Sequence, residues 1–308
     1  MYYIKRFELY SFPNSMIELN SWLEKFVIEK FYWWINRENL SRYNETFVIY
    51  ADDMDMVPPR DFPLSRIKID LLFTVRKDDE WGVTGHAHDF KRKGDVDVEC
   101  VMSEYKYGDL VPSMGIQIYS KSDVIEVEDI VQSLKSSIRH ELTHLYELFQ
   151  IKKAGHKSPW TGDISNAIIN TLTLINKGVV EDFMFLAYYM TSDIERSASL
   201  SEYTIKEIPF EHRSIKSEGM IKKIMKVPKN IFINNLKSNL TKSEQDKVYN
   251  RFISSYKEQL SFRKRNKRVI RKCIDFDSFI EYLYDETMKN LPKWRKKLNK
   301  IKYQIDNG

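Results

Sequence analysis

A change in hydrophobic periodicity partway along the chain is the strongest constraint on its fold. Before residue 121, four segments alternate or cluster β-branched and aromatic residues between prolines and glycines, which is typical of strands. These segments are TFVIYA (46–51), RIKIDLLFTV (66–75), GDVDVECVMSEY (94–105) and MGIQIYS (114–120). From residue 127 the pattern is helical almost to the end. The sequence therefore predicts an α+β fold, with a small antiparallel or mixed sheet across about residues 45–120 and helices after it.

A further helix is expected before the strands. The segment SMIELNSWLEKFVIEKFYWWIN (15–36) has helix-like periodicity. The apolar residues available for its buried side are Ile17, Trp22, Phe26, Ile28, Phe31 and Trp34.

The charges divide the chain into two parts. Residues 221–308 hold 23 Lys and Arg against 9 Asp and Glu, whereas residues 1–220 hold 26 against 35. The composition changes across about residues 205–230, where two prolines and a glycine also occur. We therefore expect a core over residues 1–220 and a basic helical region over 221–308.

Composition also limits the compartment. The N-terminus MYYIKRFELYSFPNSM carries charges where a signal peptide would be apolar, and no run of about 18 apolar residues occurs. The two cysteines, Cys100 and Cys273, form no C-x-x-C pair, so neither a disulfide scaffold nor a thiolate metal site is indicated. We expect a soluble protein of the cytoplasm, without a secretory signal, a transmembrane segment or a membrane partner.

The pentapeptide His140-Glu141-Leu142-Thr143-His144 lies inside a helix that is expected over about residues 127–150. At 100° per residue, the two histidines fall together on the side opposite an apolar stripe, with Glu141 beside them. The stripe consists of Ile130, Leu134, Ile138, Leu142, Leu145 and Phe149. Two imidazoles from one rigid helix suit Zn²⁺, which takes a third protein ligand from elsewhere and keeps a position open for water. Glu141 can accept the proton of that zinc-bound water.

HELTH, with the strand GIQIYS before it, resembles the active-site helix of the zincin metallopeptidases. The resemblance covers about residues 45–205, and the pentapeptide is its highly specific part. It implies a zincin-like core in which the small sheet packs on the active-site helix. It also implies that a Glu141-activated, zinc-bound water hydrolyses peptide bonds of a peptide or protein substrate. The substrate would pair with an edge strand, either VDVECVMSE or MGIQIYS.

The third metal ligand is less constrained by the sequence. A metzincin would need glycine and histidine where the chain has Glu147 and Gln150, so that subclass is excluded. The gluzincin-type resemblance points instead to Glu195, on a helix expected over about residues 193–206. The same Glu195 would close a capping box with Ser192, and the two roles are compatible. The alternatives for the third ligand are Asp193, Glu181, Asp163, Glu202 and His156.

For two further sets of residues, a functional role is one explanation and ordinary packing is the other. Tyr203, Tyr188, Tyr189 and His156 are candidate donors to the oxyanion that develops during hydrolysis. His86 and His88, two apart, would share one face of a strand and could form a second metal site, although a turn or an exposed strand explains them as well.

The basic region contains an amphipathic helix that begins at a capping box of Thr241 and Glu244. Two basic clusters with interspersed apolar residues follow, RKRNKRVIRK (263–272) and KWRKKLNKIK (293–302). Such clusters contact nucleic acid or another acidic surface, and the alternative is a solvated lysine-rich exterior. The candidate binding surface comprises Arg263, Lys264, Arg265, Lys267 and Arg268.

Two functions are compatible with these features. The first is a zinc metalloendopeptidase, which the intact Glu141 favours because a purely structural site needs no base. The second is a structural or nucleic-acid-associated protein that retains a zincin fold and docks through its basic helices. In style of sequence the chain resembles zincin-type proteins of tailed bacteriophages, some of which are carried in the virion. That resemblance implies action in the host cytoplasm or association with the virion.

Overall fold

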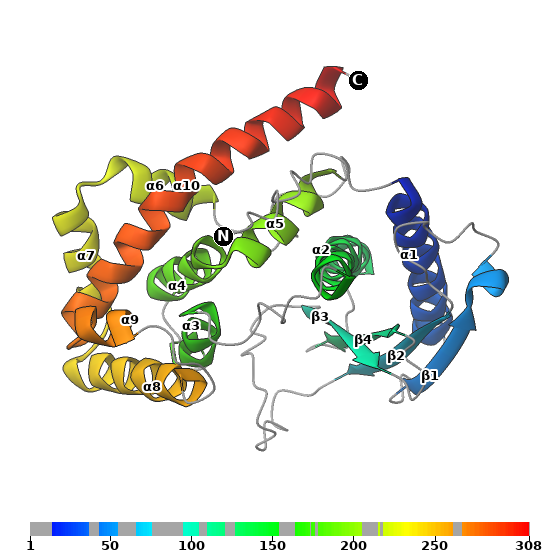
Figure 1. Cartoon of the computed structure of the whole chain (residues 1–308), viewed down its shortest axis with the longest axis horizontal. Helices are drawn as coiled ribbons and strands as arrows, with labels where there is room; N and C mark the ends of the chain where they lie inside the picture. Colours follow the sequence, from blue (N-terminus) through cyan, green and yellow to red (C-terminus); the bar gives the residue numbers. More distant parts are fainter. Residues whose placement is uncertain are drawn as a thin grey trace. The chain divides into compact units, whose positions relative to one another are not determined.

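The computed structural model describes most of the chain, with gaps between the described segments (Figure 1). The described residues are 14–36, 43–54, 66–75, 95–104, 110–120, 127–153, 164–172, 174–175, 178–204, 215, 218–260 and 267–307. The chain forms two compact units. Unit 1 comprises Met1–Gly85, Phe90–His156 and Ser201–Ser214, and unit 2 comprises His86–Asp89, Lys157–Leu200 and Ile215–Gly308.

Unit 1 is built on a mixed four-stranded sheet. Its strands are β1 (Tyr43–Tyr50), β2 (Arg66–Val75), β3 (Asp95–Glu104) and β4 (Leu110–Ser120), in the order β1-β2-β4-β3. β2 pairs with β4 in parallel, and the other two pairs are antiparallel. A short 3-10 helix, η1 (Ala51–Met54), follows β1. The predicted sheet across residues 45–120 is thus confirmed, as a mixed sheet.

Two helices, α1 (Asn14–Ile35) and α2 (Val127–Lys153), cover the same face of this sheet (Figure 1). The register aligns Ile69 with Met114, and Leu71 with Ile116, so that their buried side chains form rows under the helices. Of the apolar stripe predicted on α2, Ile130, Leu134, Ile138, Leu142 and Leu145 are buried, and the side chain of Phe149 lies outside the described ones. These side chains and those of α1 form one hydrophobic core with β1, β2 and β4.

The buried face of α1 agrees with the predicted one at Phe31 and Trp34 and differs from it elsewhere. Its core residues are Met16, Leu19, Leu23, Val27, Phe31 and Trp34, which follow one another at spacings of three and four. Ile17 is instead 44% exposed, and Trp22 and Phe26 lie at the rim with their rings stacked 5.2 Å apart. The aliphatic stripe takes the core position because its side chains all project from one narrow sector of the helix.

The secondary-structure elements described in unit 2 are all helices. Its helices are α3 (Ile164–Leu172), α4 (Gly178–Thr191), α5 (Asp193–Ser201), α6 (Glu218–Lys226), α7 (Lys229–Ser238), α8 (Lys242–Leu260), α9 (Lys267–Lys272) and α10 (Phe276–Asn307). Phe183, Phe232, Phe252 and Phe279 are fully buried in it. The capping box of α8 is confirmed, because the backbone N–H of Glu244 donates to Thr241 Oγ1 (3.3 Å) and the N–H of Thr241 donates to Glu244 Oε2 (2.7 Å).

The boundary between the two compact units is not a single position at residue 220. α3 packs on α8, and α4 packs on α10, so helices from before residue 200 share a core with the C-terminal ones. The short 3-10 helix η2 (Glu202–Thr204), by contrast, belongs to unit 1. The described chain is a mixed, mostly helical α+β structure. None of its helices combines the length and apolar composition needed to cross a membrane.

Candidate metal centre

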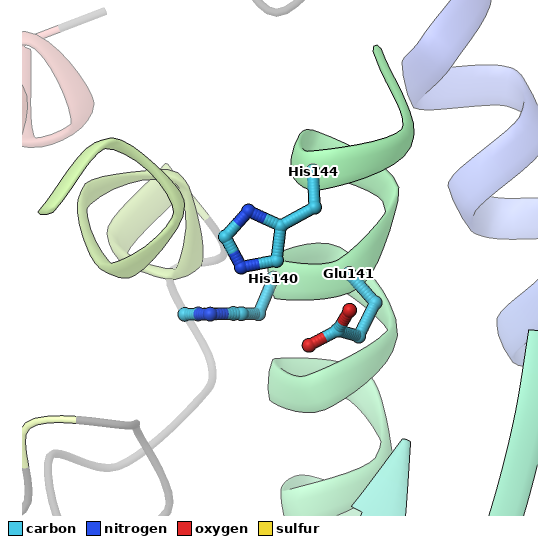
Figure 2. Close-up of side chains that lie close together, drawn as sticks. All are labelled: His140, Glu141 and His144. Carbon is cyan, nitrogen blue, oxygen red and sulfur yellow. The ribbon is translucent and has the colours of Figure 1, made fainter. Parts of the chain in front are cut away.

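The side chains of His140, Glu141 and His144 gather on one side of α2 (Figure 2). One potential ligand atom from each lies within 4.8 Å of the other two. The two imidazole rings are 4.6 Å apart between centroids and nearly perpendicular. His140 is 6% exposed and His144 3%, whereas Glu141 is half-buried. The predicted helix and the predicted convergence of these three residues are therefore present.

A buried carboxylate holds the first histidine. Glu202 Oε1, in η2, lies 2.6 Å from His140 Nδ1, and Ser136 Oγ donates to Glu202 Oε2 at 2.9 Å. The Glu202 side chain is fully buried. When it is ionised, a carboxylate only accepts hydrogen bonds, so the His140 tautomer that suits this contact is the one protonated on Nδ1. In that tautomer Nε2 is the nitrogen that a metal would take. A histidine in this tautomer, braced by a carboxylate, is the arrangement typical of metal-binding histidines.

Further hydrogen bonds fix the chain around Glu202 against α2. Thr143 Oγ1 donates to Ser201 Oγ at 2.7 Å, and Arg139 Nη2 donates to Thr204 Oγ1 at 2.9 Å. Burial lowers the pKa of Arg139 to about 10, and the negative charge of Glu24 opposes that shift. The carboxylate of Glu202 is thus positioned by bonds on both sides of it.

From the sequence, Glu202 was only an alternative third ligand, and its contact with His140 was not predicted. Its role depends on a pairing across 62 residues, for which a single sequence offers no spacing rule. The sequence held one weak signal for this role. Glu202 lies between Ser201 and Tyr203 near the end of a predicted helix, where all three side chains could be buried.

Glu195 is buried near the start of α5, at 4% exposure. Its backbone N–H donates to Ser192 Oγ at 3.3 Å, so the predicted cap by Ser192 is present. The helix expected over residues 193–206 consists of α5 followed directly by η2. Glu195 belongs to unit 2 and the histidines to unit 1, and its role as third ligand stays a prediction.

The remaining candidates are placed as follows. Tyr203 is buried in η2 beside Glu202, and Tyr188 is half-buried in α4 with its ring packed edge-on against Tyr189 at 5.0 Å. Glu181 is half-buried in α4. Several residues lie outside the described ones: His86, His88, His156, Asp163, Arg263, Lys264 and Arg265. The side chains of Asp193, Lys267 and Arg268 are not described either, although their helices are.

The sheet topology distinguishes between the two strands that were considered as the edge for a substrate. β4, which contains MGIQIYS, lies between β2 and β3. β3, which contains VDVECVMSE, pairs on one side only in the described part of the chain and lies beside α2. Only β3 therefore has an edge to offer next to the helix that carries the histidines.

The donor set fits a transition metal. Two imidazole nitrogens and a carboxylate oxygen within one small group suit Zn²⁺ and its neighbours, and the Glu202 contact leaves the outer nitrogen of His140 available. The group could therefore hold a metal ion. No protein-family model matches the chain, and no curated protein and no solved structure shows significant similarity to it.

Proposed function

We propose that the chain is a zinc metalloendopeptidase with a zincin-like core of the gluzincin type. His140 and His144 are the zinc ligands, Glu195 is the third, and Glu141 is the general base. The observation that carries the proposal is the buried Glu202 carboxylate on His140 Nδ1, because it orients the imidazole for an outer ligand. The location of Glu141 one residue beyond that histidine adds the base that a hydrolase requires.

Zinc, when bound, supplies Lewis acidity, which lowers the pKa of a water molecule to about 7 and polarises the substrate carbonyl. The carboxylate of Glu141 takes a proton from the water as the water oxygen attacks the carbonyl carbon. Glu141 then returns this proton to the amide nitrogen as the C–N bond breaks, so one water is consumed for each peptide bond. The extended substrate adds to the edge of β3 by backbone hydrogen bonds.

The proposal is tested by metal analysis and by hydrolysis of casein. The purified protein is expected to contain one zinc per chain, and both His144→Ala and Glu195→Ala to lose it. Glu141→Gln should keep the zinc and lose hydrolysis. Glu128→Gln, an exposed glutamate at the start of the same helix, is the matched control and should keep both.

Two results would contradict parts of this assignment. Equal hydrolysis by Glu141→Gln and the wild type would remove the catalytic role. Zinc retained by Glu195→Ala would exclude that ligand and return the search to Glu181, Asp163, Asp193, Glu202 and His156. Tyr203, Tyr188 and His156 are then compared as oxyanion donors through their effect on kcat at unchanged zinc content.

A second candidate function is a virion or nucleic-acid-associated protein that retains the zincin fold. It would act in the host cytoplasm or be packaged in a phage particle, with basic helices as the docking surface. The excess of Lys and Arg over residues 221–308 favours such docking. Mass spectrometry of purified particles that found none of the protein would exclude the virion form.

A further inference from the structure

The second half of α10 has a one-sided charge distribution. Residues 287–304 include seven Lys and Arg and no Asp or Glu. The opposite side of this half is anchored, because Trp294, Leu298 and Ile301 are buried and the Trp294 indole N–H donates to Ser199 Oγ at 3.0 Å. The basic residues therefore lie on a helix whose rotation about its own axis is fixed by packing.

Five of these cations share one face. At 100° per residue they fall within a sector about 100° wide, opposite the buried side of the helix. We call them the lysine face: Lys289, Lys293, Lys296, Lys297 and Lys300, all exposed. Each lies three or four residues from another member of the face, the spacing at which side chains are neighbours on a helix surface. The nearest acidic residue in sequence, Glu286, pairs with Lys289 at 3.3 Å and lies before the face begins.

Ordinary causes of a basic helix surface do not explain this arrangement. Cations stabilise a helix through its macrodipole only within about the last turn, and Lys300 lies seven residues before the end of α10 at Asn307. A solvated helix surface usually mixes charges of both signs. α8 does so, because Lys242 pairs with Asp246 at 3.4 Å and Lys257 is followed by Glu258.

We propose that the lysine face of α10 binds the phosphate backbone of duplex nucleic acid without sequence preference. Its five lysines span a rise of about 16 Å along the helix. One strand of a duplex carries about five phosphates over that distance, at about 3.4 Å each. Tyr303, 69% exposed and three residues beyond Lys300, extends the face with a hydroxyl that can bond to phosphate or sugar.

The lysine face shares no residue with the candidate metal centre or with the basic cluster at residues 263–268. It deepens the second candidate function by naming the surface and its partner, and it does not depend on the proposed peptidase activity. The test measures the affinity of the full-length protein for a fluorescein-labelled 20-base-pair DNA by anisotropy, between 50 and 200 mM NaCl. Five phosphate contacts predict a slope of about −4.5 for log Kobs against log salt, which is roughly a 500-fold loss of affinity over this range.

Two triple variants with the same change in net charge locate the binding surface. Lys293→Gln, Lys296→Gln and Lys300→Gln together should reduce the slope by about three units and weaken binding at 50 mM NaCl. The matched control, Lys242→Gln, Lys247→Gln and Lys257→Gln on α8, should leave the slope unchanged. Glutamine has about the same helix propensity as lysine, so both proteins keep their helices, which circular dichroism checks.

Three outcomes would overturn the proposal. The first is an equal loss in both triple variants, because binding would then follow net charge alone. The second is an unchanged slope in the α10 variant. The third is binding to phosphatidylserine vesicles or to polyglutamate with no binding to the duplex, which would assign the face to another acidic partner.

Discussion

The side chain of Glu202 has both of its oxygens engaged by residues of α2, one turn apart on that helix. His140 Nδ1 contacts one oxygen, and Ser136 Oγ donates a hydrogen bond to the other. A carboxylate held in this way cannot rotate away, so it fixes both the tautomer and the ring plane of the histidine. At the scale of the residue, the candidate metal centre therefore depends on a side chain outside the HELTH motif.

Glu202→Gln tests this dependence. The amide keeps the size of the side chain but replaces one acceptor oxygen by an NH2 group, which cannot accept a hydrogen bond, so zinc affinity should fall by roughly 10- to 100-fold. Competition with a chromophoric chelator measures the change, and Glu128→Gln is the control. Unchanged affinity would contradict the bracing role. Complete loss of zinc, at an unchanged melting temperature, would instead make Glu202 a direct ligand.

Cys273 should be unreactive in the native protein. It is fully buried, and burial raises the pKa of its thiol to about 12, so almost no thiolate forms at pH 8. Iodoacetamide followed by peptide mass spectrometry should find this cysteine unmodified in the native protein and modified after unfolding. Rapid native labelling would show that the thiol is accessible, contrary to the structure.

At the scale of the element, α10 begins with a reciprocal cap. The backbone N–H of Ser278 donates to Asp275 Oδ1 at 2.8 Å, and the N–H of Asp275 donates to Ser278 Oγ at 3.1 Å. The hydrogen bonds from Ser278 lower the pKa of Asp275. The charged form of Asp275 is therefore the one that the helix N-terminus stabilises.

Asp275→Ala should lower the free energy of unfolding by about 1 kcal/mol at pH 7. Because the folded-state pKa is depressed, the contribution of the charge is fully present above the unfolded pKa of about 3.9 and is lost as the pH falls through the folded value. Urea denaturation at pH 7 and pH 3 should thus show a smaller difference between wild type and variant at pH 3. Asp52→Asn, an exposed aspartate in η1, is the control, and a difference independent of pH would contradict the argument.

The elements were largely predictable because their signals are local. The alternation in RIKIDLLFTV and the apolar stripe of α2 each depend on the residues of one segment. On α1 the burial of Phe31 and Trp34 was predicted correctly, but the aliphatic part of the buried side was missed, because the aromatic residues obscured the stripe that begins at Met16. The strand order and the contact of Glu202 with His140 could not be predicted, since both depend on which distant segments pair.

At the scale of the whole molecule, the candidate site and the lysine face belong to different compact units. His140 and His144 lie in unit 1, with their own core of sheet and helices, and α10 lies in unit 2. The histidines and the lysine face therefore belong to different hydrophobic cores, whereas Glu195, the proposed third ligand, belongs to unit 2. The acidic surplus of residues 1–220 and the basic surplus of 221–308 were visible in the sequence. The sequence did not show that residues 157–200 belong to the same compact unit as the C-terminal helices.

Zinc should stabilise the folded protein if the metal site is formed on folding. A ligand that binds only the native state adds about 2.7 kcal/mol at a free concentration of 100 times its Kd. Differential scanning calorimetry should therefore show a higher melting temperature with zinc than with EDTA for the wild type. His144→Ala should show no such rise, and an equal rise in this variant would indicate zinc binding elsewhere.

α10 contains Pro292, one residue before the run of basic residues begins at Lys293. Proline has no amide hydrogen, so one rung of the helical hydrogen-bond ladder is missing between the two halves of this 32-residue helix. The halves are consequently weakly coupled in local unfolding, and the terminal half can fray without opening the first. The order of the terminal half then depends on the burial of Trp294, Leu298 and Ile301.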